Sequence, residues 1–317
     1  MSTPRIRTVT VPDEEMLNAL QPTPEGIDVV VWDFHSDPQG ARYGDVDVVV
    51  LPYMSLGDMR GPLAKIPDLK LVQTQSTGYE GVPEMVGDGV AVASAAGVHA
   101  AATAELAVGL AIASLRGIDV AVRNQNDGVW QPGRFTGLAD RRVLLLGVGG
   151  IGAEIAKRLD AFEVTLTRVG SSARNDERGR VHSSDELVSL AAEHDVLIVI
   201  TPLNDSTRGL VDAKVLAALP DGALVVNVAR GAVVDSDALT REVISGRLKA
   251  AIDVFDPEPM PQDHPLWAAP NAIITPHNGG NTGAFEPRII KLLRSQLQAL
   301  ADSREPANLV RRGHWGN

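Results

Sequence analysis

Short runs of apolar residues rich in valine and isoleucine recur along the chain and are separated by segments of helical periodicity. The apolar residues in each run are consecutive, which is typical of strands buried on both faces of a parallel sheet. Strands that alternate with helices predict βαβ units with right-handed crossovers. The expected strands span residues 6–11, 27–32, 45–51, 69–75 and 90–94, and then 142–147, 163–168, 195–201, 222–228, 248–254 and 271–276.

These runs form two series, which predict two α/β domains, each a Rossmann-like, doubly wound parallel sheet. Long helical patterns over residues 99–118 and 284–300 lie on either side of the second series and suit connections between the domains. The helix at 284–300 is expected to return to the first domain. The predicted domains are therefore 1–97 with 283–317, and 98–282.

Composition narrows the class of protein. The chain has 317 residues, 44% of them hydrophobic, which supports real cores, and no apolar run approaches the length of a membrane span. Its formal net charge of −11 argues against nucleic acid or an anionic membrane as a partner. The first residues lack the pattern of a signal peptide, and there is no cysteine for disulfides or thiolate metal sites. We expect a cytoplasmic protein that binds no metal.

A glycine-dense turn follows the first strand of the second series. Gly147, Gly149 and Gly152 form G-x-G-x-x-G between an apolar strand and a helical pattern, as in dinucleotide-binding folds. Gly147 permits the tight turn, Gly149 lets the backbone approach a pyrophosphate, and Gly152 lets helix and strand pack closely. The free N–H groups at the helix start suit phosphates. A purely structural turn is the alternative interpretation.

The next strand is expected to end at Arg168, where an acidic residue normally binds the ribose of NAD. Arginine cannot accept hydrogen bonds from ribose hydroxyls, but it makes charge-assisted bonds to a 2′-phosphate. Ser171, Ser172 and Arg174 follow and could contribute to the same pocket. The sequence therefore favours NADP(H), with NAD possible. The alternative role for Arg168 is a solvated loop charge.

Polar residues follow three of the later strands. Arg230, Glu258 and His277 each come just after an apolar run, so parallel strands would place all three at one edge, the edge of the glycine turn. There His277 can give a proton to a carbonyl oxygen, Glu258 can favour its imidazolium form, and Arg230 can bind a carboxylate. The set predicts reversible reduction of a 2-oxo acid. Taken singly, each residue could be an ordinary surface group.

Six segments carry a more specific signal: TAELAVGLAIASLR, LLLGVGGIGAEIAKRL, ITPLNDSTRGLV, LVVNVARGAVVD, AAIDVFDPEPMPQDHPLW and ITPHNGGNT. In content and order they resemble the D-isomer-specific 2-hydroxyacid dehydrogenases over almost the whole chain. The resemblance implies catalytic roles for Arg230, Glu258 and His277. It also implies a flavodoxin-like substrate domain, an active site in an interdomain cleft that closes on substrate, and a homodimer joined through the nucleotide-binding domain.

The resemblance also implies binding residues. A turn of Ser76, Thr77 and Gly78 is expected to bind the substrate carboxylate through backbone N–H groups. Independently of the resemblance, Tyr53 and Met54 follow the third expected strand and are candidates to line the substrate pocket, although large apolar side chains are more often core. The expected cofactor contacts are Thr103, Gly147, Gly149, Gly150, Ile151, Gly152, Arg168, Ser171, Thr201, Pro202, Thr207, Val228, Ala229, Asp253 and Gly279.

Some positions depart from the family pattern. Gly150 stands where many members have arginine or serine, His99 near a frequent asparagine, and Asn278 where an aliphatic residue is common. Arg168 in place of aspartate resembles glyoxylate and hydroxypyruvate reductases that prefer NADPH. Two alternatives to such a reductase stay open: an NAD-dependent enzyme like phosphoglycerate dehydrogenase, and a dinucleotide-sensing protein like the corepressors related to this family.

Overall fold

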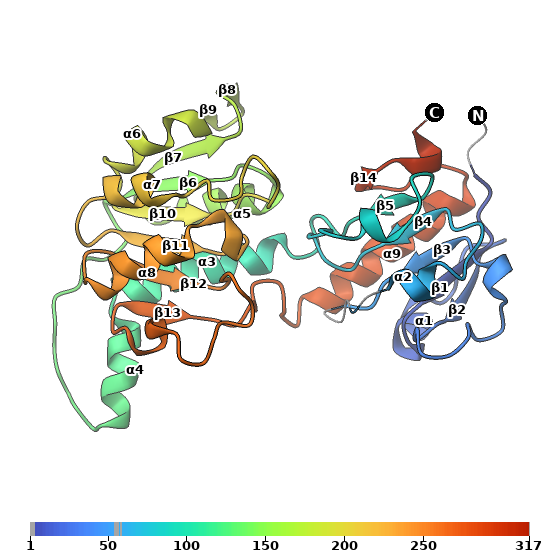
Figure 1. Ribbon diagram of the computed structural model, residues 1–317, viewed down its shortest axis with the longest axis horizontal. Coiled ribbons are helices and arrows are strands. Elements are labelled where there is room, and N and C mark those ends of the chain that lie inside the picture. Colours follow the sequence, from blue (N-terminus) through green and yellow to red (C-terminus); the bar gives the residue numbers. More distant parts are fainter. Residues whose placement is uncertain (1–3, 54–56, 58, 317) are drawn as a thin grey trace. The chain divides into compact units, whose positions relative to one another are not determined.

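The chain forms two compact α/β units, shown in the computed structural model of Figure 1. The structure describes residues 4–53, 57 and 59–316. The first unit comprises Met1–His99 and Gly283–Asn317, and the second comprises Ala100–Thr282. Each unit is built on a largely parallel sheet, which confirms the predicted fold class.

The sheet of the first unit has six strands in the order β14-β5-β4-β3-β1-β2. All neighbours are parallel except β14, which runs antiparallel to β5. Its strands are β1 (Thr8–Val11), β2 (Asp28–Val31), β3 (Val48–Val50), β4 (Leu71–Gln73), β5 (Ala91–Ala93) and β14 (Leu309–Arg311).

Helices α1 (Glu14–Leu20) and α9 (Phe285–Ala301) share one hydrophobic core with the first sheet. Successive strand residues point to opposite faces, so Val48 and Val50 face this core, whereas Val49 faces a second core that includes Leu63 of α2 (Arg60–Leu63). Asp13 begins α1 by accepting a hydrogen bond from the Met16 N–H. The long C-terminal helix α9 thus belongs to the first unit.

The sheet of the second unit has eight strands in the order β13-β12-β11-β10-β6-β7-β9-β8. Only β8 runs antiparallel to its neighbour. The strands are β6 (Arg142–Leu146), β7 (Thr165–Gly170), β8 (Arg174–Asp176), β9 (Gly179–Ser183), β10 (Val196–Val199), β11 (Leu224–Asn227), β12 (Lys249–Ile252) and β13 (Ala272–Ile274).

Both faces of the second sheet are covered, which explains the continuous apolar strands. Val143 and Leu145 of β6 face a core with α3 (Ala100–Leu115) and α5 (Gly150–Leu159), whereas Leu144 and Leu146 face a core on the other side. That core includes residues of α6 (Leu187–Ala191), α7 (Ala213–Ala218) and α8 (Ser236–Ile244). Fully burying a side chain of this kind stabilises the fold by about 1.5–3 kcal/mol. Helix α4 (Ile118–Asn126) follows α3.

All eleven predicted strands are present, but three further strands are not apparent from the apolar pattern. β8, β9 and β14 are short and largely polar or exposed. In addition, β7 continues to Gly170, two residues beyond the predicted end at Arg168. None of the helices in the described part of the chain is long and apolar enough to cross a membrane.

Candidate active site

The glycine turn joins β6 to α5 as the motif predicts. Gly147 has a φ of +116°, and a Cβ atom there would lie 2.7 Å from the Ile200 carbonyl carbon. A Cβ atom on Gly152 would collide with the carbonyl oxygen of Gly147. Both positions therefore require glycine, because β6, the start of α5 and the end of β10 meet there without room for side chains.

The turn is open on its other side. Gly149 caps α5 and Gly150 begins it, both are exposed, and a Cβ atom on either would meet nothing within 4 Å. The first N–H groups of a helix have no partner within the helix, and they carry partial positive charge. Bare N–H groups in open space fit the pyrophosphate of a dinucleotide. Ile151 lies in the same first turn of α5.

Three neighbouring parallel strands, β11, β12 and β13, end at the same edge of the second sheet. Arg230 follows β11, Glu258 follows β12 and His277 follows β13. The segment after Arg230 packs against the loop that carries Glu258, because a Cβ atom on Gly231 would collide with the Phe255 carbonyl. Gly231, which sequence reasoning did not single out, therefore allows the close approach of these two loops.

His277 and Glu258 form a hydrogen-bonded pair. His277 Nδ1 lies 2.8 Å from Glu258 Oε2, and the other carboxylate oxygen of Glu258 accepts a hydrogen bond from the Phe255 N–H at 3.1 Å. The His277 side chain is 46% exposed, so it remains open to a substrate. A carboxylate on Nδ1 fixes the ring orientation and leaves Nε2 to exchange a proton.

Electrostatic interactions shift the pKa values of both members of this pair. The hydrogen bond to Glu258 raises the pKa of His277 above its usual value, although burial and the charge of Arg230 oppose this. Burial opposes ionisation of Glu258, but hydrogen bonds from His277 and the Phe255 N–H, with the charge of Arg230, lower its pKa overall. Because Arg230 acts on both groups, the three predicted catalytic residues lie within one electrostatic neighbourhood.

Asp253 organises the segment that carries His277. It is buried, and its Oδ1 accepts hydrogen bonds from the Thr275 hydroxyl at 2.5 Å and the Asn278 N–H at 2.8 Å. Its Oδ2 accepts one from the Gly279 N–H at 2.8 Å, and its carbonyl accepts the His277 N–H at 2.8 Å. The sequence suggested Asp253 as a cofactor contact but not this bracing role, whose signal is an acidic residue directly after a buried strand.

Six further expected cofactor residues lie at three places in the second unit. Thr103 lies beside Asp253 and Gly279, since a Cβ atom on Gly279 would be 3.0 Å from Asp253 Oδ2 and 3.4 Å from Thr103 Cγ2. Thr207 braces its own turn by donating its hydroxyl to the Pro202 carbonyl at 2.7 Å. Thr201 and Pro202 follow β10 and Val228 and Ala229 follow β11, which places them at the carboxyl edge of the sheet.

Arg168 does not extend from the strand end as the sequence suggested. It lies inside β7, only 7% exposed, and its guanidinium makes two hydrogen bonds to the Asp176 carboxylate, at 2.7 and 2.8 Å. Gly170 ends the strand instead, and the exposed Ser171 follows it. A Cβ atom on Gly170 would lie 2.9 Å from Arg174 Nη1. Contact between Arg168 and a cofactor stays a prediction.

In the first unit, the turn of Ser76, Thr77 and Gly78 lies beyond the carboxyl end of β4. The Ser76 hydroxyl donates to the Gly78 carbonyl at 2.6 Å, and the Ser76 carbonyl accepts from the Ala95 N–H and the Thr74 hydroxyl, both at 2.8 Å. These bonds hold the turn rigidly. The Thr77 hydroxyl oxygen is buried and has no hydrogen-bond partner among the described residues.

Tyr53 belongs to an aromatic stack at the same edge of the first sheet. Its ring lies 4.1 Å from that of Phe285 and 5.5 Å from that of His99, centroid to centroid. His99 Nε2 lies 2.8 Å from the Gln75 carbonyl oxygen, which fixes the stack. Burial raises the pKa of the Tyr53 phenol. The sequence did not single out Phe285, and Met54, predicted beside Tyr53, lies outside the described residues.

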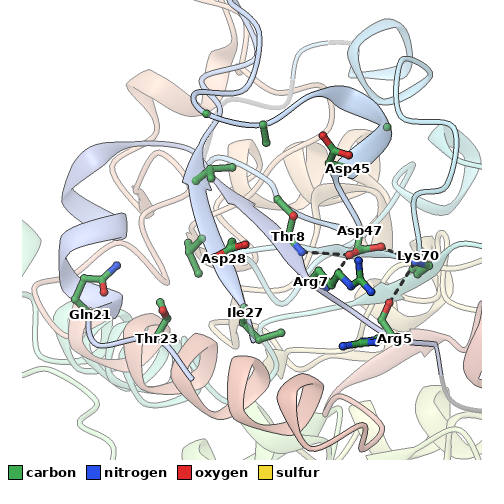
Figure 2. A pocket seen from close by; sticks show the side chains of 15 residues that line it. Arg5, Arg7, Thr8, Gln21, Thr23, Ile27, Asp28, Asp45, Asp47 and Lys70 are labelled. Atoms are coloured by element: carbon green, nitrogen blue, oxygen red, sulfur yellow. Dashed lines mark hydrogen bonds and ion pairs between the residues drawn. The ribbon is translucent and has the colours of Figure 1, made fainter. Parts of the chain in front are cut away.

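A cavity of about 900 Å³ lies elsewhere in the first unit (Figure 2). It is at the amino ends of β1 and β2, whereas ligands of parallel sheets bind beyond the carboxyl ends. There the Asp47 carboxylate accepts hydrogen bonds from the Arg7 and Thr8 N–H groups and pairs with Lys70. These contacts link the segments that precede β1, β3 and β4, which is a structural role. We therefore do not assign the catalytic site to this cavity.

Comparison with known proteins agrees with this geometry. The family model of the NAD-binding domain of D-isomer specific 2-hydroxyacid dehydrogenases matches residues 108–279. A glyoxylate reductase of Aeropyrum pernix is 30% identical over 96% of both chains. A D-isomer specific 2-hydroxyacid dehydrogenase of Xanthobacter autotrophicus, solved with NADPH, is 27% identical with a TM-score of 0.81, over 98% of this chain and 100% of that one.

A further solved structure is an NADPH-dependent glyoxylate/hydroxypyruvate reductase of Sinorhizobium meliloti, in complex with NADP and malonate. It is 28% identical, with a TM-score of 0.77 and 98% coverage of both chains. The chain belongs to the D-isomer specific 2-hydroxyacid dehydrogenase family. It is an NAD(P)-dependent oxidoreductase.

Proposed function

We propose that this enzyme reduces a small 2-oxo acid, such as glyoxylate or hydroxypyruvate, to a D-2-hydroxy acid with NADPH, in a reversible reaction. The observation that carries the proposal is the hydrogen bond between His277 and Glu258, within the electrostatic reach of Arg230. Relatives named glyoxylate reductase and glyoxylate/hydroxypyruvate reductase support the substrate class.

The chemistry divides among three side chains. The dinucleotide supplies the hydride that reaches the carbonyl carbon. Arg230 binds the substrate carboxylate and polarises the carbonyl through charge-assisted hydrogen bonds. His277, protonated because Glu258 stabilises its imidazolium form, donates a proton to the carbonyl oxygen. In the reverse direction, neutral His277 accepts the hydroxyl proton.

Two further residue groups belong to this proposal. The backbone N–H groups of Ser76, Thr77 and Gly78 bind the substrate carboxylate, with Tyr53 and Met54 against the rest of the substrate. The cofactor residues are Thr103, Gly147, Gly149, Gly150, Ile151, Gly152, Arg168, Ser171, Thr201, Pro202, Thr207, Val228, Ala229, Asp253 and Gly279, some of them acting through neighbouring groups. The open helix start at Gly149 and Gly150 supports the assignment.

The preference for NADPH rests on what stands at the end of β7. Gly170 offers no carboxylate to ribose hydroxyls, and the exposed Arg174 lies beside it. An exposed guanidinium beside a strand end that offers no carboxylate favours a 2′-phosphate. The NADPH and NADP complexes of two relatives support the same preference.

We also propose a cytoplasmic homodimer joined through the nucleotide-binding unit, with α4 in the contact. Ile118 and Val122 of α4 are about half exposed, and Trp130 shortly after it is 96% exposed. Ile118 and Val122 are four residues apart and so share one face of α4, and exposed apolar side chains of this size are typical of protein interfaces. The cytoplasm holds the reduced dinucleotide that such an enzyme uses.

The function is tested by measuring kcat/KM for a panel of 2-oxo acids with NADPH and with NADH. The proposal expects turnover of a small 2-oxo acid, faster with NADPH. Faster turnover with NADH, together with oxidation of phosphoglycerate by NAD, would instead support the phosphoglycerate dehydrogenase alternative. Dinucleotide binding without turnover of any 2-oxo acid would support the corepressor-like alternative.

A further inference from the structure

A short hairpin extends the second sheet beyond β7. Arg168 of β7 is paired with Val181 of β9, and Val181 is paired with Arg174 of β8. Side chains at paired positions point to the same face of a sheet, and residues two apart on one strand share a face. Arg168, Gly170, Arg174 and Asp176 therefore lie on one face of this hairpin region.

Arg168 is fully engaged on this face. Its Nη1 and Nη2 donate to the two Asp176 carboxylate oxygens, and Nη2 also lies 3.4 Å from the Arg180 carbonyl. The Asp176 carboxylate also accepts the Arg178 N–H at 2.8 Å. This guanidinium is buried and makes a bidentate pair with a carboxylate, so few of its N–H groups are left to bind a ligand. Its role is to hold β8 in place.

Arg174 is placed differently. It is exposed, and its Nη1 lies 2.9 Å from the position that a Cβ atom of Gly170 would take. Val148, between the first two glycines of the turn, approaches the same position to 3.2 Å. Arg174 therefore stands at the strand end and beside the glycine turn, where an acidic residue binds the ribose in NAD-dependent folds. Its Nη1 also donates to the Ser172 carbonyl at 3.1 Å, which orients it.

We propose that the ion pair of Arg168 and Asp176 anchors β8 to β7 and thereby positions Arg174, the residue assigned above to the 2′-phosphate of NADPH. Asp176 and Arg174 are two residues apart on a three-residue strand, so the anchor acts almost directly on Arg174. Asp176 then controls cofactor selectivity as a positioning residue, without touching the cofactor. This inference rests on the proposed preference for NADPH.

The test is calorimetric titration of the protein with NADP⁺, with NAD⁺ and with adenosine 2′,5′-bisphosphate. For Arg174→Met we expect affinity for NADP⁺ and the bisphosphate to fall about 10- to 100-fold, and affinity for NAD⁺ to change less than about 2-fold. Arg180→Met is the matched control: it removes an equal charge from the same hairpin, at an exposed side chain 3.5 Å from Glu186. It should leave all three affinities nearly unchanged.

Asp176→Asn tests the positioning role, since it keeps the size of the side chain and removes its charge. We expect a smaller loss, about 3- to 10-fold for NADP⁺, with NAD⁺ affinity retained and the KM for NADPH raised at constant kcat. Equal losses for NADP⁺ and NAD⁺ would show a merely structural role and overturn the positioning part.

Two outcomes separate this inference from the proposed function. If the wild-type protein binds NADP⁺ more tightly than NAD⁺ and Arg174→Met keeps that ratio, the role of Arg174 is wrong while the NADPH preference stands. If the wild-type protein binds NAD⁺ more tightly, the proposed preference itself fails, and this inference fails with it.

Discussion

The Nδ1 atom of His277 lies 2.8 Å from Oε2 of Glu258, although 19 positions separate the two residues in the sequence. The contact arises because β12 and β13 are parallel neighbours, so the loops after them meet at one edge. The carboxylate stabilises the positive imidazolium and leaves Nε2 to carry the exchangeable proton. We expect this relationship to set the pH dependence of the enzyme.

In the proposed mechanism reduction requires protonated His277, so kcat/KM should fall as pH rises through the pKa of His277, which lies above the usual value of 6.5. Glu258→Gln removes the charge that raises this pKa. We expect the descending limb of the pH profile to move to lower pH, with a loss of about 10-fold or more in alkaline solution. A profile of kcat/KM against pH for both proteins checks this, and an unmoved limb would show that Glu258 does not tune His277.

Arg230 is expected to bind the substrate carboxylate and the carbonyl together. Arg230→Met should lower kcat/KM for 2-oxo acids by about 10²- to 10³-fold, and Arg230→Lys by less, because lysine keeps the charge but not the planar fork. Steady-state kinetics measure the effect, with the exposed Arg241→Met as control. A wild-type kcat/KM in Arg230→Met would exclude this role.

Gly149 and Gly152 make a matched pair, because substitution by alanine replaces one hydrogen atom with a methyl group at each position. Gly152→Ala places a Cβ atom into the Gly147 carbonyl oxygen and should destabilise the protein by about 1–3 kcal/mol. Gly149→Ala meets nothing within 4 Å, so stability should hold while dinucleotide affinity falls by about 10-fold. Thermal unfolding and calorimetric titration separate the two effects. Unchanged affinity in Gly149→Ala would argue against close approach of a pyrophosphate.

Asp253 accepts three hydrogen bonds through its carboxylate from the segment around His277. In Asp253→Asn the side-chain NH2 group replaces a carboxylate oxygen and faces at least one N–H or O–H donor, so one hydrogen bond is lost. We expect the free energy of unfolding to fall by about 1–3 kcal/mol. We expect Tm to fall by about 3–10 °C, and kcat to fall because His277 loses its support. Differential scanning calorimetry and steady-state kinetics check this against the exposed Asp263→Asn. A Tm equal to that of the control would mean that Asp253 is not a brace.

The sequence predicted the fold well because buried parallel strands are visible in it as unbroken apolar runs. It failed for β8, which reads Arg174, Asn175 and Asp176, because this strand packs against no core and is held by an ion pair. The same ion pair explains the error at the end of β7. A charged residue normally marks a strand end, but here Asp176 neutralises Arg168 and allows its burial inside the strand.

In the candidate site, too, some features could be predicted from the sequence and others could not. The placement of Arg230, Glu258 and His277 at one edge of the sheet could be predicted because each follows an apolar run, and parallel topology brings such positions to one edge. The bracing role of Asp253 could not, since it depends on three hydrogen bonds from a loop more than 20 residues away. The stack of Tyr53 with Phe285 likewise joins residues from opposite ends of the chain, which no local pattern relates.

The most direct test is kcat for NADPH-dependent reduction of the best 2-oxo acid by His277→Ala beside the wild-type enzyme, with the dissociation constant of NADPH measured for both. We predict that kcat falls by about 10²- to 10⁴-fold while the affinity for NADPH stays the same. A His277→Ala enzyme that reduces the 2-oxo acid at close to the wild-type rate would contradict the assignment of His277 as the proton donor.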